Sequence, residues 1–137
     1  MEAFRSTLIK AALEARANAY APYSGYRVGA ALLTENEEVY TGCNIENASY
    51  GATNCAERTA FFKALSEGKR RFKAIAIAGG KEGSPEDYAF PCGICRQVMQ
   101  EFCKEDFVIL VTKTEQDYQE YRLKDMLPHG FGGDKLQ

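Results

Sequence analysis

An uninterrupted apolar segment, FVILVT, occupies residues 107–112 and sets a strong limit on the possible folds. A run without polar alternation is typical of a strand that is covered on both faces of a sheet. Residues 72–78 are interpreted as a second short buried strand, and a helical pattern at residues 92–104 separates the two. This strand–helix–strand order predicts a sheet with helices packed on its faces.

Segments on either side of these elements supply the rest of the predicted sheet. Residues 26–34 and 39–43 are expected to form two strands joined by the turn ENEE, which makes them a hairpin. Residues 118–123 are expected to form a fifth strand at an edge, and residues 4–20 and 54–68 to form helices. The sequence therefore predicts an α/β fold in three layers, α/β/α, around one five-stranded mixed sheet.

Length and charge narrow the class of protein. A chain of 137 residues predicts a single domain that spans residues 1–137. Its formal net charge of −2 gives no electrostatic reason to expect a nucleic-acid partner. Charged residues within the first twenty positions argue against a secretory leader. No apolar run approaches the roughly 20 residues that a membrane span needs. We therefore expect a cytoplasmic protein without a membrane partner.

The cysteines point to a metal site. There are five, and in a reducing compartment they indicate metal binding or catalysis more than disulfides. Cys55 lies at the start of one predicted helix, and Cys92 and Cys95 lie at the start of the next. Helix N-termini of strand–helix–strand units collect at the carboxyl edge of the strands, where ligands usually bind. Three thiolates can therefore converge from two neighbouring helix starts.

The number of available ligands distinguishes two kinds of zinc site. A structural site is closed by four protein ligands, whereas a catalytic site keeps one position for water. The other candidate ligands are Cys43, Cys103 and His129, and none has ligand spacing to the three cysteines. An open site is therefore favoured. Glu57 follows Cys55 by two residues and is suited to act as a proton shuttle beside it.

The start of the first of these helices has to meet a geometric condition. Side chains two residues apart on a regular helix point in very different directions, so Cys55 and Glu57 share one site only if Cys55 has a non-helical backbone. Thr53 and Asn54 are suitable capping residues to place the helix edge there. Arg58 can donate a hydrogen bond to a thiolate and offset the negative charge that three thiolates bring to Zn²⁺.

Five motifs in order resemble the zinc-dependent cytidine deaminases, most closely the small homotetrameric nucleoside type with a three-cysteine zinc site. The resemblance covers most of the chain. The motifs are AYAPYSGYRVGAAL (19–32), GCNIENASYG (42–51), NCAERTA (54–60), PCGICRQV (91–98) and MLPHGF (126–131).

The resemblance implies a reaction. The family hydrolyses cytidine and 2′-deoxycytidine to uridine and 2′-deoxyuridine and releases ammonia. It implies that Cys55, Cys92 and Cys95 bind one Zn²⁺ per subunit, with water as the fourth ligand. It also implies that Glu57 protonates the pyrimidine at N3 and later passes a proton to the departing ammonia.

The resemblance also implies a substrate site. Asn44 and Glu46 match residues that hold the ribose hydroxyls, the backbone of Ala56 would meet the base carbonyl, and Tyr26 matches an aromatic residue that packs beside the base. Position 26 is more often Phe in the family, so its hydroxyl needs a partner or contact with solvent.

Two aromatic residues are assigned to a subunit interface by the same resemblance. Phe131 matches an aromatic residue that a neighbouring subunit delivers, and Tyr50 is placed at that interface. The family implies a homotetramer whose active sites are completed by neighbouring subunits. The glycines around Phe131 are a departure from the family pattern that bears on how its ring is placed.

Other interpretations remain open from the residues themselves. The three cysteines could form a structural zinc module, or Cys92 and Cys95 a thiol–disulfide couple, although the chain has no Trp next to that motif. A polynucleotide deaminase and a deaminase of nucleoside antibiotics are further alternatives. Asn44 could instead satisfy backbone groups of an Asx-turn. The basic run GKRRFK at residues 68–73 is interpreted as a solvated loop.

Overall fold

The computed structural model describes residues 2–81 and 88–136 and contains a five-stranded sheet. The strands run in the order β2-β1-β3-β4-β5, with β3 and β4 parallel and every other neighbouring pair antiparallel. This is the mixed sheet that the sequence predicts. Its strands are β1 (Tyr26–Thr34), β2 (Val39–Cys43), β3 (Phe72–Lys81), β4 (Val108–Thr112) and β5 (Tyr118–Arg122).

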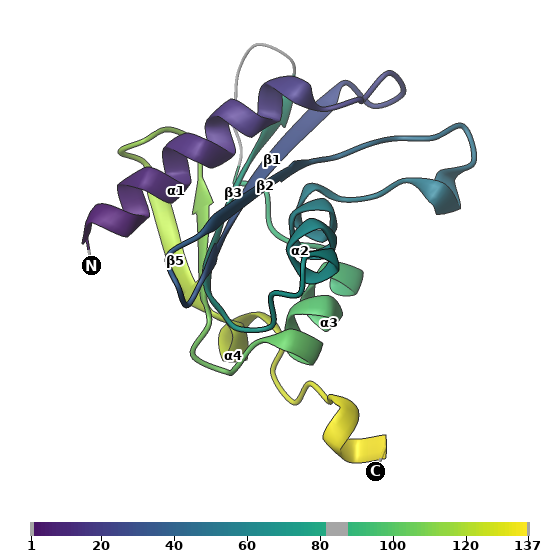
Figure 1. The fold of residues 1–137 in the computed structure, drawn as a ribbon. Coiled ribbons are helices and arrows are strands. Elements are labelled where there is room, and N and C mark those ends of the chain that lie inside the picture. Colours follow the sequence, from purple (N-terminus) through teal and green to yellow (C-terminus); the bar gives the residue numbers. More distant parts are fainter. Residues whose placement is uncertain (1, 82–87, 137) are drawn as a thin grey trace.

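Helices cover both faces of this sheet, so the predicted three-layer arrangement is confirmed (Figure 1). One face carries α1 (Glu2–Ala15), which is followed by the 3₁₀ turn Arg16–Asn18. The other face carries α2 (Ala56–Ser66) and α3 (Gly93–Phe102), with the short α4 (Leu123–Met126) beside them. Two further 3₁₀ turns occupy Tyr50–Ala52 and Gly133–Leu136. Within the part of the chain that is described, no helix combines the length and apolar character needed to cross a membrane.

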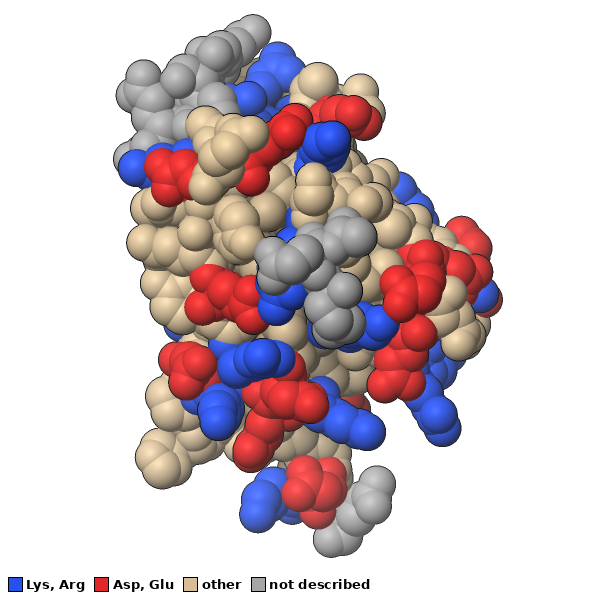
Figure 2. All heavy atoms as spheres, turned by 90° about the vertical axis from the view of Figure 1, so that its left-hand side faces the viewer, with Lys and Arg blue, Asp and Glu red and all other residues tan. Residues whose placement is uncertain are grey.

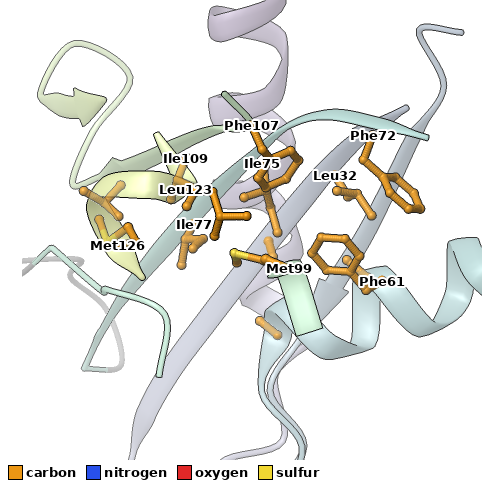
Figure 3. Close-up of a cluster of buried hydrophobic side chains, with 14 of the residues drawn as sticks. Leu32, Phe61, Phe72, Ile75, Ile77, Met99, Phe107, Ile109, Leu123 and Met126 are labelled. Carbon is orange, nitrogen blue, oxygen red and sulfur yellow. The ribbon is translucent and has the colours of Figure 1, made fainter. Parts of the chain in front are cut away.

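Side chains along each strand point alternately to the two faces of the sheet, and a hydrophobic core lies on each face. Ile75 and Ile77 of β3 point toward α2 and α3, whereas Ala74, Ala76 and Ala78 point toward α1. This follows from the two-residue side-chain period of a strand. Figure 3 shows the first of these cores, which also contains Leu32, Phe61, Phe72, Met99, Phe107, Ile109, Leu123 and Met126.

The element boundaries differ from the sequence-based expectations in two informative places. The first helix ends at Ala15 and tightens into a 3₁₀ turn that ends at Asn18, short of the expected residue 20. Strand β3 continues three residues beyond the expected residue 78, because Gly79 and Gly80 pair with Val28 and Arg27 of β1. The extension brings β3 alongside the first residues of β1, where Lys81 pairs with Tyr26.

Candidate active site

Two cysteines occupy the N-cap positions of the two helices on the same face of the sheet. Cys55 caps α2 with φ −76° and ψ 155°, and Cys92 caps α3 with φ −70° and ψ 171°. Cys55 therefore has the non-helical backbone that a shared site with Glu57 requires. The expected cap at Thr53 or Asn54 is wrong, since the cysteine itself is the N-cap.

The sulfur atoms of Cys55, Cys92 and Cys95 form one cluster. All three Sγ atoms lie within 4.8 Å of one another, and those of Cys55 and Cys92 are 3.7 Å apart. Tetrahedral zinc with Zn–S bonds of about 2.3 Å needs sulfur atoms roughly 3.8 Å apart. The cluster therefore fits zinc. Among the described residues, no fourth His, Cys, Asp or Glu joins it, which is the pattern of an open site.

Arg58 lies against this cluster. Its Nη2 atom donates to Sγ of Cys55 over 3.3 Å, as the sequence suggests it can. The thiolates in turn raise the pKa of Arg58, chiefly through the hydrogen bond to Cys55. The guanidinium therefore stays charged and withdraws negative charge from the sulfur of Cys55.

The thiols also influence one another. The hydrogen bond from Cys95 lowers the pKa of Cys55 to about 5, with Arg58 contributing in the same direction against the effect of burial. The same contact, together with burial, raises the pKa of Cys95. Negative charge therefore collects on Cys55, the sulfur that Arg58 contacts. Zinc holds cysteines as thiolates, so a preformed thiolate favours its binding.

Glu57 sits in the first turn of α2 with only 4% of its surface exposed. Burial raises the pKa of its carboxyl to about 7, and the nearby charge of Cys55 adds to the shift. A general acid–base group works best when its pKa is near the working pH. Glu57 is therefore poised both to take up and to release a proton at neutral pH.

A pocket of about 280 Å³ opens over this acid and the thiols. Tyr26, Val28 and Asn44 line one side of it, and the residues from Thr53 to Glu57 line another. The predicted residues Tyr26, Asn44, Cys55, Ala56 and Glu57 are thus brought together around one hollow.

The third wall of the pocket consists of Tyr88, Ala89 and Phe90, none of which the sequence pattern predicts as site residues. The hydroxyl of Tyr88 donates to Asp117, and Lys113 Nζ lies 4.6 Å from the centre of the Tyr88 ring. The Phe90 ring packs edge-on against Tyr121 at 5.8 Å. The only sequence signal for this wall is its position directly before Pro91 and Cys92.

Asn44 is tied to the backbone of β1. Its Oδ1 accepts from the amide of Val28 at 2.8 Å, and its Nδ2 donates to the carbonyl of Tyr26 at 2.9 Å. These bonds match the backbone-satisfying role that the sequence left open. They also fix the amide at the edge of the pocket, which leaves the second lone pair of Oδ1 and the second N–H of Nδ2.

Glu46 lies in an adjoining hollow of about 340 Å³, which it lines with Tyr23, Ser24 and Tyr50. Its carboxylate accepts from the amides of Tyr23 and Ser24 and from the Ser24 hydroxyl. These bonds, led by the one from the hydroxyl, lower the pKa of Glu46. Thr53 lines both hollows and connects them.

Phe131 and Tyr50 do not line the pocket of Glu57. Phe131 follows α4 with 55% of its surface exposed, and its backbone carbonyl accepts from Nε2 of Gln97 at 2.9 Å. Tyr50 is 78% exposed in its 3₁₀ turn. Both aromatic rings therefore present free surface outside the pocket of their own chain.

Comparison with known proteins identifies the family of this chain. A family profile described as the cytidine and deoxycytidylate deaminase zinc-binding region matches residues 3–111. The chain belongs to the cytidine deaminase family. It is 48% identical over 129 residues to a cytidine deaminase of Sporosarcina psychrophila, with 94% of this chain and 92% of the relative covered. It is 50% identical over 133 residues to one of Halalkalibacterium halodurans, with coverages of 96% and 97%.

Solved structures of the cytidine deaminase family have the same fold. The crystal structure of the enzyme from Burkholderia pseudomallei matches with a TM-score of 0.82 at 49% identity, covering 91% of this chain and 97% of that one. The Mycobacterium tuberculosis enzyme matches with a TM-score of 0.78 at 41% identity, with coverages of 92% and 95%. The family and fold expected from the sequence are confirmed, and the three-cysteine cluster fits the zinc-binding region that the family description names.

Proposed function

We propose that this chain deaminates cytidine and 2′-deoxycytidine hydrolytically to uridine and 2′-deoxyuridine, with one zinc ion per subunit. The observation that carries the proposal is a pocket lined by a buried acid and by two of three clustered thiols. Glu57, Cys55 and Cys92 all line that pocket, and Cys95 completes the sulfur cluster. The names of the close relatives support the choice of cytidine.

In this proposal Cys55, Cys92 and Cys95 hold the zinc ion. Bound zinc acts as a Lewis acid and lowers the pKa of water at its open position. The rest of the chemistry belongs to the chain. A water oxygen bonds to C4 of the pyrimidine, the C4–N bond breaks, and the amine leaves as ammonia. Glu57 moves both protons, first to N3 as the C4–O bond forms and then to the departing nitrogen.

We assign the pocket residues to binding. The Tyr26 ring packs beside the base, and the backbone of Ala56 in the first turn of α2 meets the base carbonyl. Asn44 and Glu46 hold the ribose hydroxyls, one from each of the two connected hollows. The carboxylate of Glu46 is kept charged by its hydrogen bonds, so it is a strong acceptor for a hydroxyl. Arg58 steadies the ligand Cys55 without touching the nucleoside.

We further propose a single domain over residues 1–137, located in the cytoplasm and assembled as a homotetramer. Phe131 and Tyr50 would then serve a neighbouring subunit's site. Their exposure outside their own pocket supports this arrangement, because large exposed aromatic side chains are typical of interfaces.

The other interpretations of the cysteines fit the site less well. A structural zinc module needs a fourth protein ligand, and the described residues offer none within the cluster. A thiol–disulfide couple of Cys92 and Cys95 gives no role to Glu57, whose buried carboxyl lies in the same pocket. A polynucleotide deaminase needs a basic groove for its substrate, whereas the chain has a net charge of −2.

The test is direct. Purified protein is incubated separately with cytidine, 2′-deoxycytidine, cytidine 5′-monophosphate and a cytosine-containing oligonucleotide, while uridine-type product, ammonia and zinc per chain are measured. We expect turnover of the two nucleosides only and one zinc per chain. Sedimentation of the same sample gives the subunit number. Fully bound zinc without nucleoside turnover would overturn the proposed function, and a monomer with full activity would overturn the shared active site.

A further inference from the structure

A second hollow lies at the opposite end of the sheet from the active site. It has a volume of about 550 Å³, within the range of roughly 300–1,000 Å³ that is typical of small-molecule sites. Phe72 at the start of β3 lines it, whereas Gly79 of the same strand packs near Tyr26 of the catalytic pocket. At about 3.3 Å per strand residue, these two positions are roughly 23 Å apart.

The lining of this hollow is basic. It includes residues 70–73 of the basic run, which the proposed deamination does not use. Two carboxylates, Glu35 and Asp106, also line it. The six cationic side chains are Arg5, Arg70, Arg71, Lys73, Lys104 and Arg122.

Only part of this positive charge is neutralised within the protein. Lys73 pairs with Glu37 at 2.6 Å, and Arg5 and Arg122 share Glu120 at 2.6 and 3.8 Å. With these two carboxylates added to the two in the lining, six cations face four anions, so an excess of two positive charges remains. The hollow therefore favours a ligand with several negative charges.

Three cations are available to such a ligand. Within residues 2–81 and 88–136, no carboxylate pairs with Arg70, Arg71 or Lys104. Arg70 is held in place by its own hydrogen bonds, because Nη1 donates to the carbonyls of Leu65 at 2.9 Å and Lys69 at 2.8 Å. Its remaining guanidinium donors are preorganised, which lowers the entropy cost of binding an anion.

The interior of the hollow is aromatic. Phe107 and Phe72 are buried at its floor, with 2% and 7% of their surfaces exposed. Phe4 and Phe102 are half-buried at its sides, and the guanidinium carbon of Arg5 lies 4.8 Å from the centre of the Phe4 ring. The lining therefore combines charged and aromatic side chains, and the rings of Phe4 and Phe102 have surface against which a planar base can pack.

We infer that this hollow is a second binding site, for a nucleoside triphosphate, separate from the deamination site. The phosphates contact Arg70, Arg71 and Lys104, and the base packs on the aromatic interior. Inorganic polyphosphate carries the same kind of phosphate chain as a nucleoside triphosphate. The aromatic residues favour the ligand that also has a nucleoside.

The charge distribution around the site argues against a nucleic-acid strand as the ligand. Figure 2 shows the face that carries α1 and β5, on which Lys and Arg side chains alternate with Asp and Glu. A nucleic-acid groove needs a continuous basic track along which a phosphate backbone can run. Here carboxylates interrupt the Lys and Arg side chains both on this face and in the lining of the hollow, where Glu35 and Asp106 lie among the cations.

Calorimetric titration of the zinc-loaded protein tests this inference. The probes are ATP, inorganic tripolyphosphate, adenosine and a single-stranded RNA oligomer, at 50 and 200 mM salt without added divalent ions. ATP is used because its purine differs from the base of the proposed substrate. We expect ATP to bind more tightly than tripolyphosphate or adenosine, and more weakly at the higher salt concentration, since its phosphates supply much of the affinity.

Matched variants locate the site. Arg71→Gln with Lys104→Gln removes two charges from the hollow, and Lys10→Gln with Lys124→Gln removes two from positions outside its lining. We expect the first pair to weaken ATP binding about tenfold or more, because each charged hydrogen bond contributes strongly, and the control pair to leave it unchanged. Lys104→Gln alone serves as a milder variant, and deamination and zinc content verify that each protein is folded.

Several results would overturn the inference. The proposed site would be wrong if the wild-type protein did not bind ATP. It would also be wrong if the hollow pair and the control pair lost ATP affinity equally. If tripolyphosphate bound as tightly as ATP, the aromatic interior would not contribute to the affinity. An RNA oligomer that binds more tightly than ATP and loses affinity in the hollow pair would replace the proposal with a nucleic-acid surface.

Discussion

Arg58 donates from Nη2 to Sγ of Cys55 over 3.3 Å, which joins the third residue of helix α2 to the residue that caps the same helix. The contact is local, because the donor and acceptor are three residues apart and both lie at one helix start. A second nitrogen, Nε of Arg58, is buried without a hydrogen-bond partner in the described part of the chain. Burial of an unpaired polar atom has a free-energy cost. We therefore infer that the contact with sulfur holds the Arg58 side chain in this buried position.

Replacement of Arg58 tests this role. We expect Arg58→Ala to weaken zinc retention and activity by about 10- to 100-fold, the usual size of an effect that acts through a metal ligand. The free energy of unfolding should change much less. Competition with a chelator measures zinc affinity, and steady-state kinetics measure kcat. Arg58→Lys retains a charge but not the planar fork, so an intermediate value is expected. Unchanged zinc affinity in Arg58→Ala would contradict the assignment.

The proposed reaction depends on Glu57 for its proton transfers. We expect Glu57→Gln to keep the zinc and the fold, since the amide has the same shape, and to lose activity by about 100- to 10,000-fold, because proton transfer is removed. Kinetics with cytidine and zinc counting on the same sample measure the two effects. A variant that loses zinc in proportion to its activity would indicate that Glu57 supports the metal and does not move protons.

The fold was more predictable from the sequence than the shape of the pocket. The hairpin of β1 and β2 has the predicted bounds, because its strands and turn are encoded in consecutive residues. Gly79 and Gly80 look like loop residues locally and become strand only through pairing with β1. The three zinc-ligand candidates were predictable since helix starts meet at one sheet edge.

The parts of the site that sequence reasoning missed depend on contacts between distant segments. The wall that contains Tyr88 is held by Asp117, which is 29 residues away in the turn between β4 and β5. The hydrogen bonds of Asn44 to Val28 and Tyr26 exist only in the register that β1 and β2 adopt. No local pattern encodes either relationship.

Two glycines of the sheet, Gly42 and Gly29, lie against helices on opposite faces. A Cβ at Gly42 would lie 2.5 Å from the carbonyl oxygen of Ala56 in α2, and one at Gly29 would lie 2.1 Å from that of Ala12 in α1. Gly51 has open space, so Gly51→Ala is the control. We expect Gly42→Ala and Gly29→Ala each to destabilise the fold by about 1–3 kcal/mol or more, because backbone atoms have to move.

Activity separates these two variants. Gly42→Ala displaces the start of α2, which carries the proposed ligand Cys55, so we expect it also to lower kcat and zinc content. Gly29→Ala acts on the opposite face and should leave the kcat of the folded fraction unchanged. Denaturant titrations and kinetics measure the two properties. Equal losses of kcat in both variants would show that the active site responds to general loosening of the sheet.

The ion pair between Arg5 and Glu120 predicts a pH-dependent contribution to stability. Nε and Nη2 of Arg5 donate to the carboxylate at 2.6 and 3.0 Å, and this contact lowers the pKa of Glu120. A lowered carboxyl pKa stabilises the fold above the usual value of 4.5, and that contribution disappears as the pH falls through the lowered pKa. We expect Glu120→Gln to cost about 0.5–1 kcal/mol at pH 7 and progressively less below pH 4.5.

Urea denaturation across this pH range measures the effect, with Glu115→Gln as the control. Glu115 lies exposed in the turn between β4 and β5 and forms no ion pair with the described residues. Its difference from wild type should stay near zero at every pH. A Glu120→Gln difference that does not shrink in acid would assign the effect to packing and not to charge.

Tyr88 and Asp117 together position the pocket wall that precedes Cys92. Tyr88→Phe keeps the ring over Lys113 and removes only the hydroxyl that donates to Asp117. We expect a loss of stability of about 1 kcal/mol, the size of one hydrogen bond, and an increase in KM of a few-fold with little change in kcat, because the wall lines the proposed substrate pocket and takes no part in the proposed proton transfer. Asp117→Asn should give the same pattern, and the double variant should be no worse than either single one. Additive losses would show that the two side chains act independently, and a fall in kcat at unchanged KM would place Tyr88 in the chemistry itself.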